Sequence, residues 1–522
     1  MKNKLIYLLG LSVVLTACDV NNELDIIEEA TIPEVVLTAG EADFSKYVSI
    51  GASFTAGYTD GALFKASQES SFPNILSQKF AMANGGAFTQ PLMSDNIGGL
   101  LIGGNPWAQP RFYFNGEVPV RLNAAPTTET AAIQAGPYNN MGIPGIKSFH
   151  LGVQGYGFIS ALPNANPYYI RMASAPGASV LQDVLTQAPT FFTLSEIGGN
   201  DVLDYALSGG TGTDQTGNFN PATYGGADIT DPNVFASVYS NTVDALTANG
   251  AKGVVATLPY ITDLPFFTVV PNNALVLDAG TAGALTGFFQ AVTGIFTQGL
   301  LLNNVPLEQA QALAAQYAIS FNEGPNRWII DVPVSASNPL GFRQMTEEEL
   351  LLLTIDQGAL AQGYGSVLLT PQVMQVLGLL QQGGTPTAQQ AGLVIAAVNG
   401  LDDKDTLDSD ELLSIKTATD AYNATIFAVA GSKNLAVVDF SSMINEASAG
   451  GLSFDNFTLT TGFVTGGLIS LDGIHLTTKG YALMANKFLE AIDMAYGSNF
   501  GQATNGLAKP GNYPTHYSPA LR

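Results

Sequence analysis

The chain has 522 residues, of which 43 are acidic and 19 basic, and its formal net charge is −24. This balance argues against nucleic acid as a partner, because binding to phosphates requires a basic surface. Only 12% of the residues are charged and 46% are hydrophobic, so a large core is possible. The length fits one large domain with insertions or two to three domains.

The first residues have the pattern of an export signal. Lys2 and Lys4 precede an apolar run from Leu5 to Leu15, and Leu-Thr-Ala-Cys follows at positions 15–18. We predict a secretory signal peptide over residues 1–17. The motif resembles a bacterial lipobox, which implies that Cys18 becomes the lipidated first residue; a plain signal peptide before an incidental cysteine is the alternative.

Cys18 is the only cysteine, so the mature chain can form neither an internal disulfide nor a cysteine-based metal site. Removal of the signal leaves 17 basic against 43 acidic residues, a formal charge of −26. Residues 18–42 are polar and acidic and contain Pro33. We expect them to link the lipid to the folded domain.

A strand, a tight turn and a helix are predicted around Ser53. The apolar run Tyr47–Gly51 predicts a strand, and Ser71-Phe72-Pro73 predicts the start of a helix. Such a turn lifts a serine hydroxyl off the carboxyl end of a parallel strand, where α/β folds place their sites. Taken alone, the pattern favours an ordinary turn serine over a nucleophile.

Residues 84–138 are expected to form a long surface excursion with little regular structure.

Two turns after this excursion could supply hydrogen-bond donors to a negative charge. In the next segment, 140–147, glycines flank Pro144 and set a rigid turn with an accessible N–H at Gly145. A predicted buried strand over Pro189–Ile197 ends in Gly-Gly-Asn-Asp, where the amide of Asn200 could donate to an oxyanion. An Asn-Asp turn cap is the alternative for Asn200.

Strands and helices then alternate, which indicates an open parallel sheet. Helices are predicted over Pro232–Asn249 and Asp408–Gly431, and strands over 253–259 and Asn434–Phe440. The segment 263–405 interrupts this alternation. Its predicted helices are 279–302, Leu307–Ile319, Thr346–Leu360 and Pro371–Gln382. Either this segment adds core or it forms a cap with an acyl-binding groove.

The stretch Ala279–Leu302 has 24 uncharged residues, as a membrane span would. Its glycines, threonines and glutamines weaken insertion into a bilayer. A single span would also place Ser53 and the residues near 472 on opposite sides of a membrane, although the motifs described below indicate that these residues act together. We therefore expect an apolar helix that packs on protein or lines a pocket.

The chain has three histidines, His150, His475 and His516. If the chemistry uses histidine as a base, it must be one of these. Asp472 lies three residues before His475 and could orient its ring and stabilise the imidazolium. His150 fits a satisfied core histidine, and His516 lies in a Pro/Gly-rich tail where we expect it to be exposed.

Four blocks in this order resemble the SGNH family of GDSL-type lipases and acylhydrolases. They are Gly51-Ala52-Ser53-Phe54, Asn140–Gly145, Gly198-Gly199-Asn200-Asp201 and Asp472–His475. The resemblance implies a three-layer α/β/α, flavodoxin-like domain with a parallel sheet of about five strands. Residues 43–262 and 406–496 would form this core, with 263–405 as a large, mostly helical insertion and 497–522 as a C-terminal tail.

The resemblance also implies a mechanism. Ser53 would be the nucleophile, His475 its base and Asp472 the residue that holds His475. The N–H groups of Ser53 and Gly145, with the Asn200 amide, would bind the oxyanion, and no metal or organic cofactor would be needed. Ala52 stands where the family has Asp, and Phe54 where it has Leu. Glu196, just before the third block, is an unusual charge for a buried strand.

The expected function is a serine esterase or lipase, a carboxylic ester hydrolase acting on acyl-ester small molecules or lipids. Its N-terminal lipid would anchor it in the cell envelope, in the outer membrane of a Gram-negative bacterium. One alternative is a surface glycan-binding lipoprotein; two tryptophans argue against it, although 19 tyrosines leave room. An inactive SGNH fold, supported by Ala52, and a carbohydrate O-acetyl esterase are the others.

Overall fold

The computed structural model describes residues 35–522, and its centre is a sheet of five parallel strands. Their order across the sheet is β17 (Ala436–Val438), β8 (Lys252–Ala256), β7 (Phe191–Leu194), β1 (Tyr47–Gly51) and β6 (Asn140–Gly142). Numbered along the chain, this is the order 2-1-3-4-5 of a doubly wound sheet, which binds ligands at the carboxyl ends of its strands. The predicted α/β class with about five parallel strands is confirmed.

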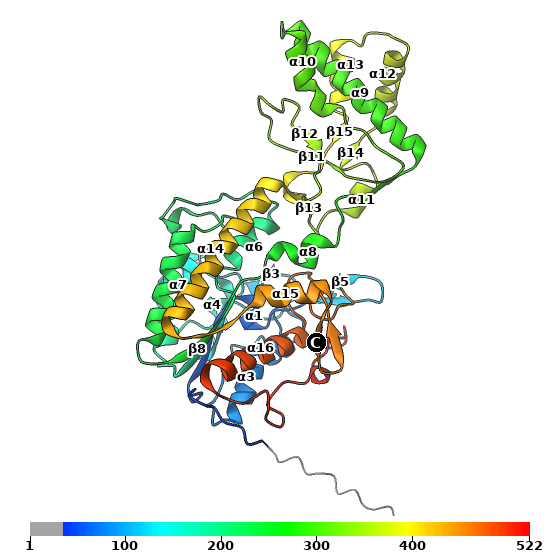
Figure 1. The fold of residues 1–522 in the computed structure, drawn as a ribbon. Coiled ribbons are helices and arrows are strands. Elements are labelled where there is room, and N and C mark those ends of the chain that lie inside the picture. The colour runs from blue at the N-terminus through cyan, green and yellow to red at the C-terminus, as the bar shows by residue number, and fades with distance from the viewer. Residues whose placement is uncertain (1–34) are drawn as a thin grey trace, which may run out of the picture.

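Helices lie on both sides of this sheet, an arrangement compatible with three layers (Figure 1). On one side α7 (Pro232–Thr247) packs against α14 (Ser409–Lys433), and on the other α3 (Phe72–Ala81) packs against α16 (Thr478–Tyr496). Because both faces are covered, β1 and β7 are buried along their whole length. The helices at 232–249 and 408–431 lie where the sequence predicts them.

Side-chain caps explain several of these boundaries. Asp231 accepts the N–H groups of Asn233 and Val234 at the start of α7. Asp439 caps α15 (Phe440–Ala449), a helix that the sequence analysis missed. The strand predicted over 434–440 therefore ends at Val438. Strand β6 was also missed, because its three residues lie within a Gly/Pro-rich stretch.

Residues 84–138 contain more regular structure than expected. Two antiparallel pairs form there, β2 (Leu100–Ile102) with β3 (Asn105–Ala108) and β4 (Phe112–Phe114) with β5 (Pro119–Arg121). Between them, the fully buried Arg111 guanidinium donates to the carbonyls of Ser518 at 2.7 Å and Leu521 at 3.0 Å. The C-terminal segment is thereby packed against this excursion.

The insertion 263–405 projects from the α/β body (Figure 1). It has two apolar cores of its own, one around Phe288, Phe289 and Phe342 and one around Trp328 and Leu351. Its helices are α8 (Pro265–Thr268), α9 (Ala279–Leu302), α10 (Leu307–Ala314), α11 (Gln357–Leu360), α12 (Pro371–Gln381) and α13 (Ala388–Ile395). Short antiparallel pairs join them: β9 (Leu275–Leu277) with β10 (Gly324–Asn326), β11 (Ile329–Asp331) with β12 (Phe342–Gln344), and β14 (Ser366–Val367) with β15 (Val398–Asn399).

Within residues 35–522, α9 is the one helix long and apolar enough to cross a membrane. Its buried side, which includes Leu285, Phe288 and Val292, contributes to the larger of the two insertion cores. It packs against α10, α12 and α13. Only 22% of its most apolar stretch is buried, so the helix packs on protein along one side and leaves the rest of its surface at least partly exposed.

The helix predicted over Thr346–Leu360 is wrong. Only its end is helical, as α11, and β13 (Leu350–Leu351) instead pairs with β16 (Thr406–Leu407). The N–H groups of the next two residues donate to Asp405 O at 3.0 Å and Phe266 O at 2.8 Å. Partners distant in sequence thus satisfy the backbone groups that a helix would have paired locally.

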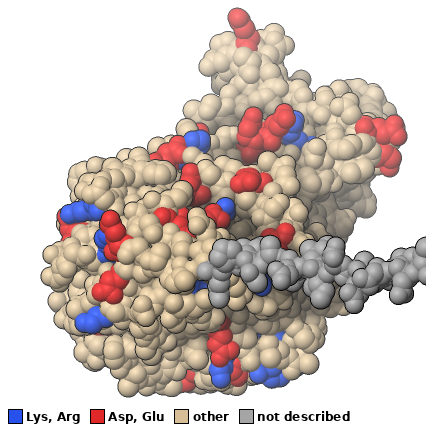
Figure 2. Space-filling view, turned by 60° about the horizontal axis from the view of Figure 1, so that its bottom comes forward, with Lys and Arg blue, Asp and Glu red and all other residues tan. Residues whose placement is uncertain are grey.

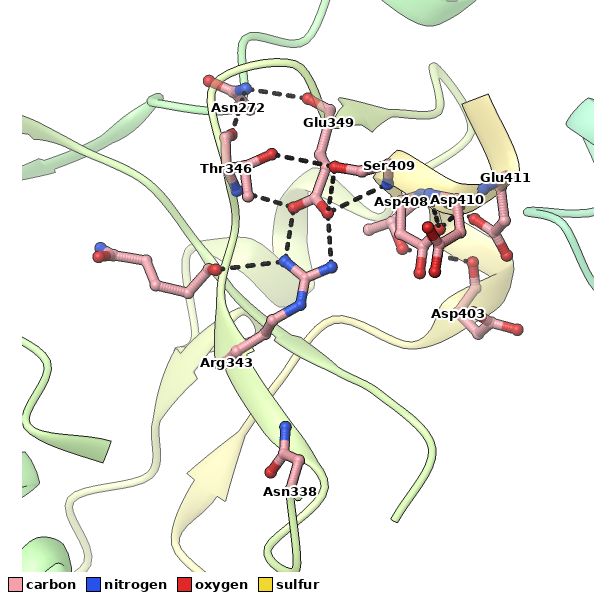
Figure 3. Close-up of polar contacts among 12 residues, drawn as sticks. Asn272, Asn338, Arg343, Thr346, Glu349, Asp403, Asp408, Ser409, Asp410 and Glu411 are labelled. Carbon is pink, nitrogen blue, oxygen red and sulfur yellow. Dashed lines mark hydrogen bonds and ion pairs between the residues drawn. The ribbon is translucent and has the colours of Figure 1, made fainter. Parts of the chain in front are cut away.

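A buried carboxylate fixes the turn before β13 (Figure 3). Glu349 is fully buried and accepts hydrogen bonds from Arg343 Nη1 at 2.8 Å, from the Thr346 N–H at 2.7 Å and from the Ser409 N–H at 3.2 Å. These contacts tie the insertion to the start of α14. Removing Arg343 would leave a buried carboxylate without its ionic partner, which is strongly destabilising.

Acidic side chains occur in several places on the face drawn in Figure 2, where Lys and Arg are fewer, in agreement with the composition. The predicted signal peptide 1–17, Cys18 and most of the expected linker lie outside the described residues. Of residues 18–42, the last eight are described. The Glu41 N–H donates to Tyr496 O at 2.8 Å and Ala42 is buried, so the end of this segment already belongs to the domain.

Candidate active site

Ser53 lies in a tight turn at the carboxyl end of β1. It is the first residue of α1 (Ser53–Ala56), which starts two positions after Gly51. A Cβ at Gly51 would lie 2.1 Å from Thr55 Oγ1 and 2.7 Å from Ser195 O, so a side chain cannot fit there. The turn therefore requires glycine, and it places the serine at the rim where doubly wound sheets bind ligands.

The structure brings together Ser53, His475 and Asp472, which come from opposite ends of the chain. Ser53 Oγ lies 2.9 Å from His475 Nε2, and His475 Nδ1 lies 2.9 Å from Asp472 Oδ2. Both distances are within hydrogen-bond reach, the geometry that a serine nucleophile and its base require. The imidazole can therefore accept a proton from the hydroxyl while the carboxylate fixes its orientation.

The carboxylate of Asp472 is held in place from several sides. Oδ1 accepts the N–H groups of Ile474 and His475, each at 2.9 Å, and Oδ2 accepts the Gly61 N–H at 2.8 Å. Burial opposes ionisation, but the contacts with His475 and these N–H groups hold the pKa of Asp472 well below its usual value. Asp472 is thus ionised beside the imidazole at neutral pH.

The other two histidines lie elsewhere. His150 Nδ1 accepts the Lys147 N–H at 3.2 Å, and burial and the Lys147 charge lower the pKa of His150 to about 4. This is the satisfied histidine that the sequence suggested. His516 is half-buried and its Nε2 lies 2.9 Å from Val464 O, so the predicted exposure of His516 is wrong.

Asn200 begins α6 (Asn200–Leu207) and lines the same pocket as Ser53. Its Nδ2 donates to Ile146 O at 2.9 Å. Because an amide has two N–H groups, the second is left for another acceptor. The buried Asp201 accepts the Ser148 N–H at 2.8 Å and the Ser148 hydroxyl at 2.6 Å. Together these contacts fix the loop after β6 beside the start of α6.

Gly145 lies on that loop, one residue before Ile146, but it is not among the residues that line the Ser53 pocket. It is exposed and has a φ of 78°, a conformation that favours glycine. Within residues 35–522 its N–H has no hydrogen-bond acceptor. The geometry thus leaves this N–H available to a bound group.

Two cavities meet at Ile474 and His475. The smaller, about 40 Å³, contains Ser53 and Asn200 and has mostly apolar walls, which include Leu203, Leu258 and Leu264. The larger, about 590 Å³, lies on the Asp472 side. Its walls come from four parts of the chain: Tyr58 and Phe112, Leu207, the insertion residues Phe266 and Leu353, and Phe463. A cavity therefore lies between the base of the insertion and the sheet rim, as the cap alternative for 263–405 requires.

Glu196 has a place in the site that the sequence did not reveal. It follows β7, has a φ of 45°, and its Oε1 accepts the N–H groups of Ala52 and Thr55, each at 2.7 Å. Oε2 is buried and has no hydrogen-bond partner among the described residues. Burial raises the pKa of Glu196 to about 7 although the hydrogen bonds lower it. The sequence signal that could have indicated this role was Ala52, which stands where the family that the chain resembles has Asp.

No group of three or more metal-ligating side chains is found in residues 35–522. Comparisons with protein-family models, with curated proteins and with solved structures found no match to this chain.

Proposed function

We propose that the protein is a serine esterase or lipase of the SGNH type. The observation that carries the proposal is the hydrogen-bonded series Ser53–His475–Asp472 at the carboxyl rim of a 2-1-3-4-5 parallel sheet. Nucleophile, base and orienting acid have the mutual geometry of a hydrolytic triad. The four sequence blocks that resemble the family also occur in its order along the chain.

The reaction follows from these groups. Ser53 Oγ attacks the ester carbonyl while His475 Nε2 takes the hydroxyl proton, and Asp472 stabilises the imidazolium. The oxyanion accepts hydrogen bonds from the N–H groups of Ser53 and Gly145 and from the Asn200 amide. His475 then protonates the leaving alcohol. Water, deprotonated by His475, hydrolyses the acyl-enzyme and restores Ser53.

The leading substrate class is an ester with a medium or long acyl chain, carried by a small molecule or a lipid. The cavity of about 590 Å³ between the insertion and the rim supports this choice, because its aromatic and aliphatic walls can bury methylene groups. No metal or organic cofactor enters the reaction.

A second candidate is an O-acetyl esterase. The space beside Ser53 itself is only about 40 Å³, which suits an acyl group of acetate size. The larger cavity would then hold the alcohol part, such as a sugar. A profile of acyl chain lengths separates the two candidates.

The proposal also includes the location. Lipidation of Cys18 would anchor the enzyme in the cell envelope, in the outer membrane of a Gram-negative bacterium. A Cys18→Ser variant should no longer incorporate labelled palmitate and should no longer be found in the membrane fraction. Membrane fractionation of Cys18→Ser that equals the wild type would contradict the anchor.

Hydrolysis of p-nitrophenyl esters from acetate to decanoate, with Ser53→Ala as the control, tests the function. We expect turnover by the wild type that disappears in Ser53→Ala. No turnover of any ester by folded wild-type protein would contradict the proposal. It would favour the inactive-fold or glycan-binding alternatives, which a glycan array would then distinguish.

A further inference from the structure

The helix that carries Ser53 lacks the usual cap. A helix N-terminus is commonly closed by a Ser, Thr, Asp or Asn side chain that accepts the N–H of the second or third helical residue. The N-cap of α1 is Ala52, which has no side-chain acceptor. The third residue of this helix is Thr55, so the Thr55 N–H needs an acceptor from elsewhere.

Glu196 supplies that acceptor from the turn that follows the neighbouring strand β7. Its Oε1 takes the Thr55 N–H and the Ala52 N–H, both at 2.7 Å, so one oxygen bridges the residues on either side of Ser53 and Phe54. A capping aspartate at position 52 could accept the Thr55 N–H in the same way. The carboxylate thus comes from 144 positions along the chain instead of from the turn itself.

The surrounding chain is shaped to hold this carboxylate. A Cβ at Gly51 would lie 2.8 Å from Glu196 Oε1, so glycine there makes room for it. Glu196 itself has a φ of 45°, which is uncommon for a residue other than glycine. Such a backbone costs free energy and persists only where its surroundings determine it. Here the strained turn after β7 directs the side chain beneath the Ser53 turn.

We propose that Glu196 is a positioning residue: from the turn after the adjacent strand β7 it holds the Ser53 turn, and it replaces the carboxylate that Ala52 lacks. Its effect on rate rests on the proposed esterase function, whereas its effect on the two amides does not. Misplacement of a nucleophile by about 1 Å can reduce turnover about 100-fold. Loss of the bridging oxygen should therefore lower kcat by about 10- to 100-fold and leave KM nearly unchanged.

Three variants test the proposal on one p-nitrophenyl ester. Glu196→Ala removes the acceptor, Glu196→Gln keeps an acceptor oxygen without the charge, and Ala52→Asp/Glu196→Ala moves the carboxylate to the cap position. We expect a low kcat for Glu196→Ala, near wild-type kcat for Glu196→Gln, and recovery of at least half of the lost activity in the double variant. Glu348→Ala, at an exposed glutamate, is the matched control and should equal the wild type.

Hydrogen exchange of the Ala52 and Thr55 amides provides a readout independent of activity. Exchange should accelerate at least 10-fold in Glu196→Ala and stay close to wild type in Glu196→Gln. If the wild type hydrolyses no ester, the proposed function fails while these amides still decide the role of Glu196. Wild-type kcat in Glu196→Ala would overturn the proposal. So would a Glu196→Gln variant as slow as Glu196→Ala, a double variant without recovery, or unchanged exchange.

Discussion

The sheet rim and the insertion differ in how they are built. The rim draws its groups from both ends of the chain, and one continuous core beneath it includes side chains from α3, α7, α14 and α16, the helices that cover the sheet. The insertion has its own two cores and reaches the site at its base, through Leu264 beside Ser53 and through Phe266, Leu353 and Thr354 in the larger cavity. Substitutions at the rim should therefore change the chemical step. Substitutions at the base of the insertion should change which ester is preferred.

The largest effect is expected at the triad. Ser53→Ala and His475→Ala should each lower kcat by several orders of magnitude, and the double variant should be hardly worse than either, because such residues act as a unit. Steady-state kinetics on one ester, with circular dichroism to verify folding, measures this. Additive losses in the double variant would show that the two residues do not act in one step.

A smaller loss is expected at Asn200, the other rim residue beside Ser53. Asn200→Ala should lower kcat by about 10²–10³, as removal of one oxyanion donor does elsewhere. Because Asn200 also donates to Ile146 O, the melting temperature must be measured on the same preparation. A lower melting temperature with nearly normal kcat would assign Asn200 to the loop structure alone.

At the insertion, the expected effect depends on the substrate. Each buried methylene contributes about 0.8 kcal/mol, so kcat/KM should rise about fourfold per methylene from acetate towards octanoate. Leu353→Ala should lower kcat/KM for octanoate and leave acetate unchanged. Leu301→Ala, at the exposed end of α9, is the control. A steady fall of kcat/KM from acetate to octanoate would instead favour the O-acetyl esterase.

The smallest effect concerns stability and pH at the rim. The pKa of Glu196 is about 7 in the folded chain, against about 4.3 for an unperturbed glutamate. The folded state therefore binds the Glu196 proton more tightly than the unfolded state does. The contribution of this proton to the free energy of unfolding is complete below about pH 4 and is lost as the pH rises through about 7. Glu196→Gln cannot titrate. As the pH rises from 5 to 8, the melting temperature of Glu196→Gln minus that of the wild type should therefore increase by a few degrees. A constant difference would contradict the raised pKa.

The parallel core was predictable because its signals are local. Apolar runs and caps such as Asp231 and Asp408 mark β1, β7, β8, α7 and α14 to within a few residues. Local signals also predicted a helix around Glu349, and this prediction was wrong because the structure there depends on contacts with Ser409 and β16, some 60 positions away.

Candidate residues were predictable where they occupy short blocks, as Ser53, Asn200 and His475 do. The role of Glu196 was not, because it depends on β7 lying beside β1 in parallel register, with Ile50 opposite Leu194. Sequence order alone places Glu196 far from Ser53. A groove at the insertion was one of two alternatives for 263–405, and the walls of the cavity also include Phe112 and Phe463, which sequence order does not place there.

The most direct test of the central claim is covalent labelling of the wild type with a fluorophosphonate probe, followed by peptide mass spectrometry. The probe reacts with serines that a neighbouring base activates. We expect one labelled residue, Ser53, and loss of labelling in both Ser53→Ala and His475→Ala. Labelling of a different serine, or unchanged labelling in His475→Ala, would contradict it.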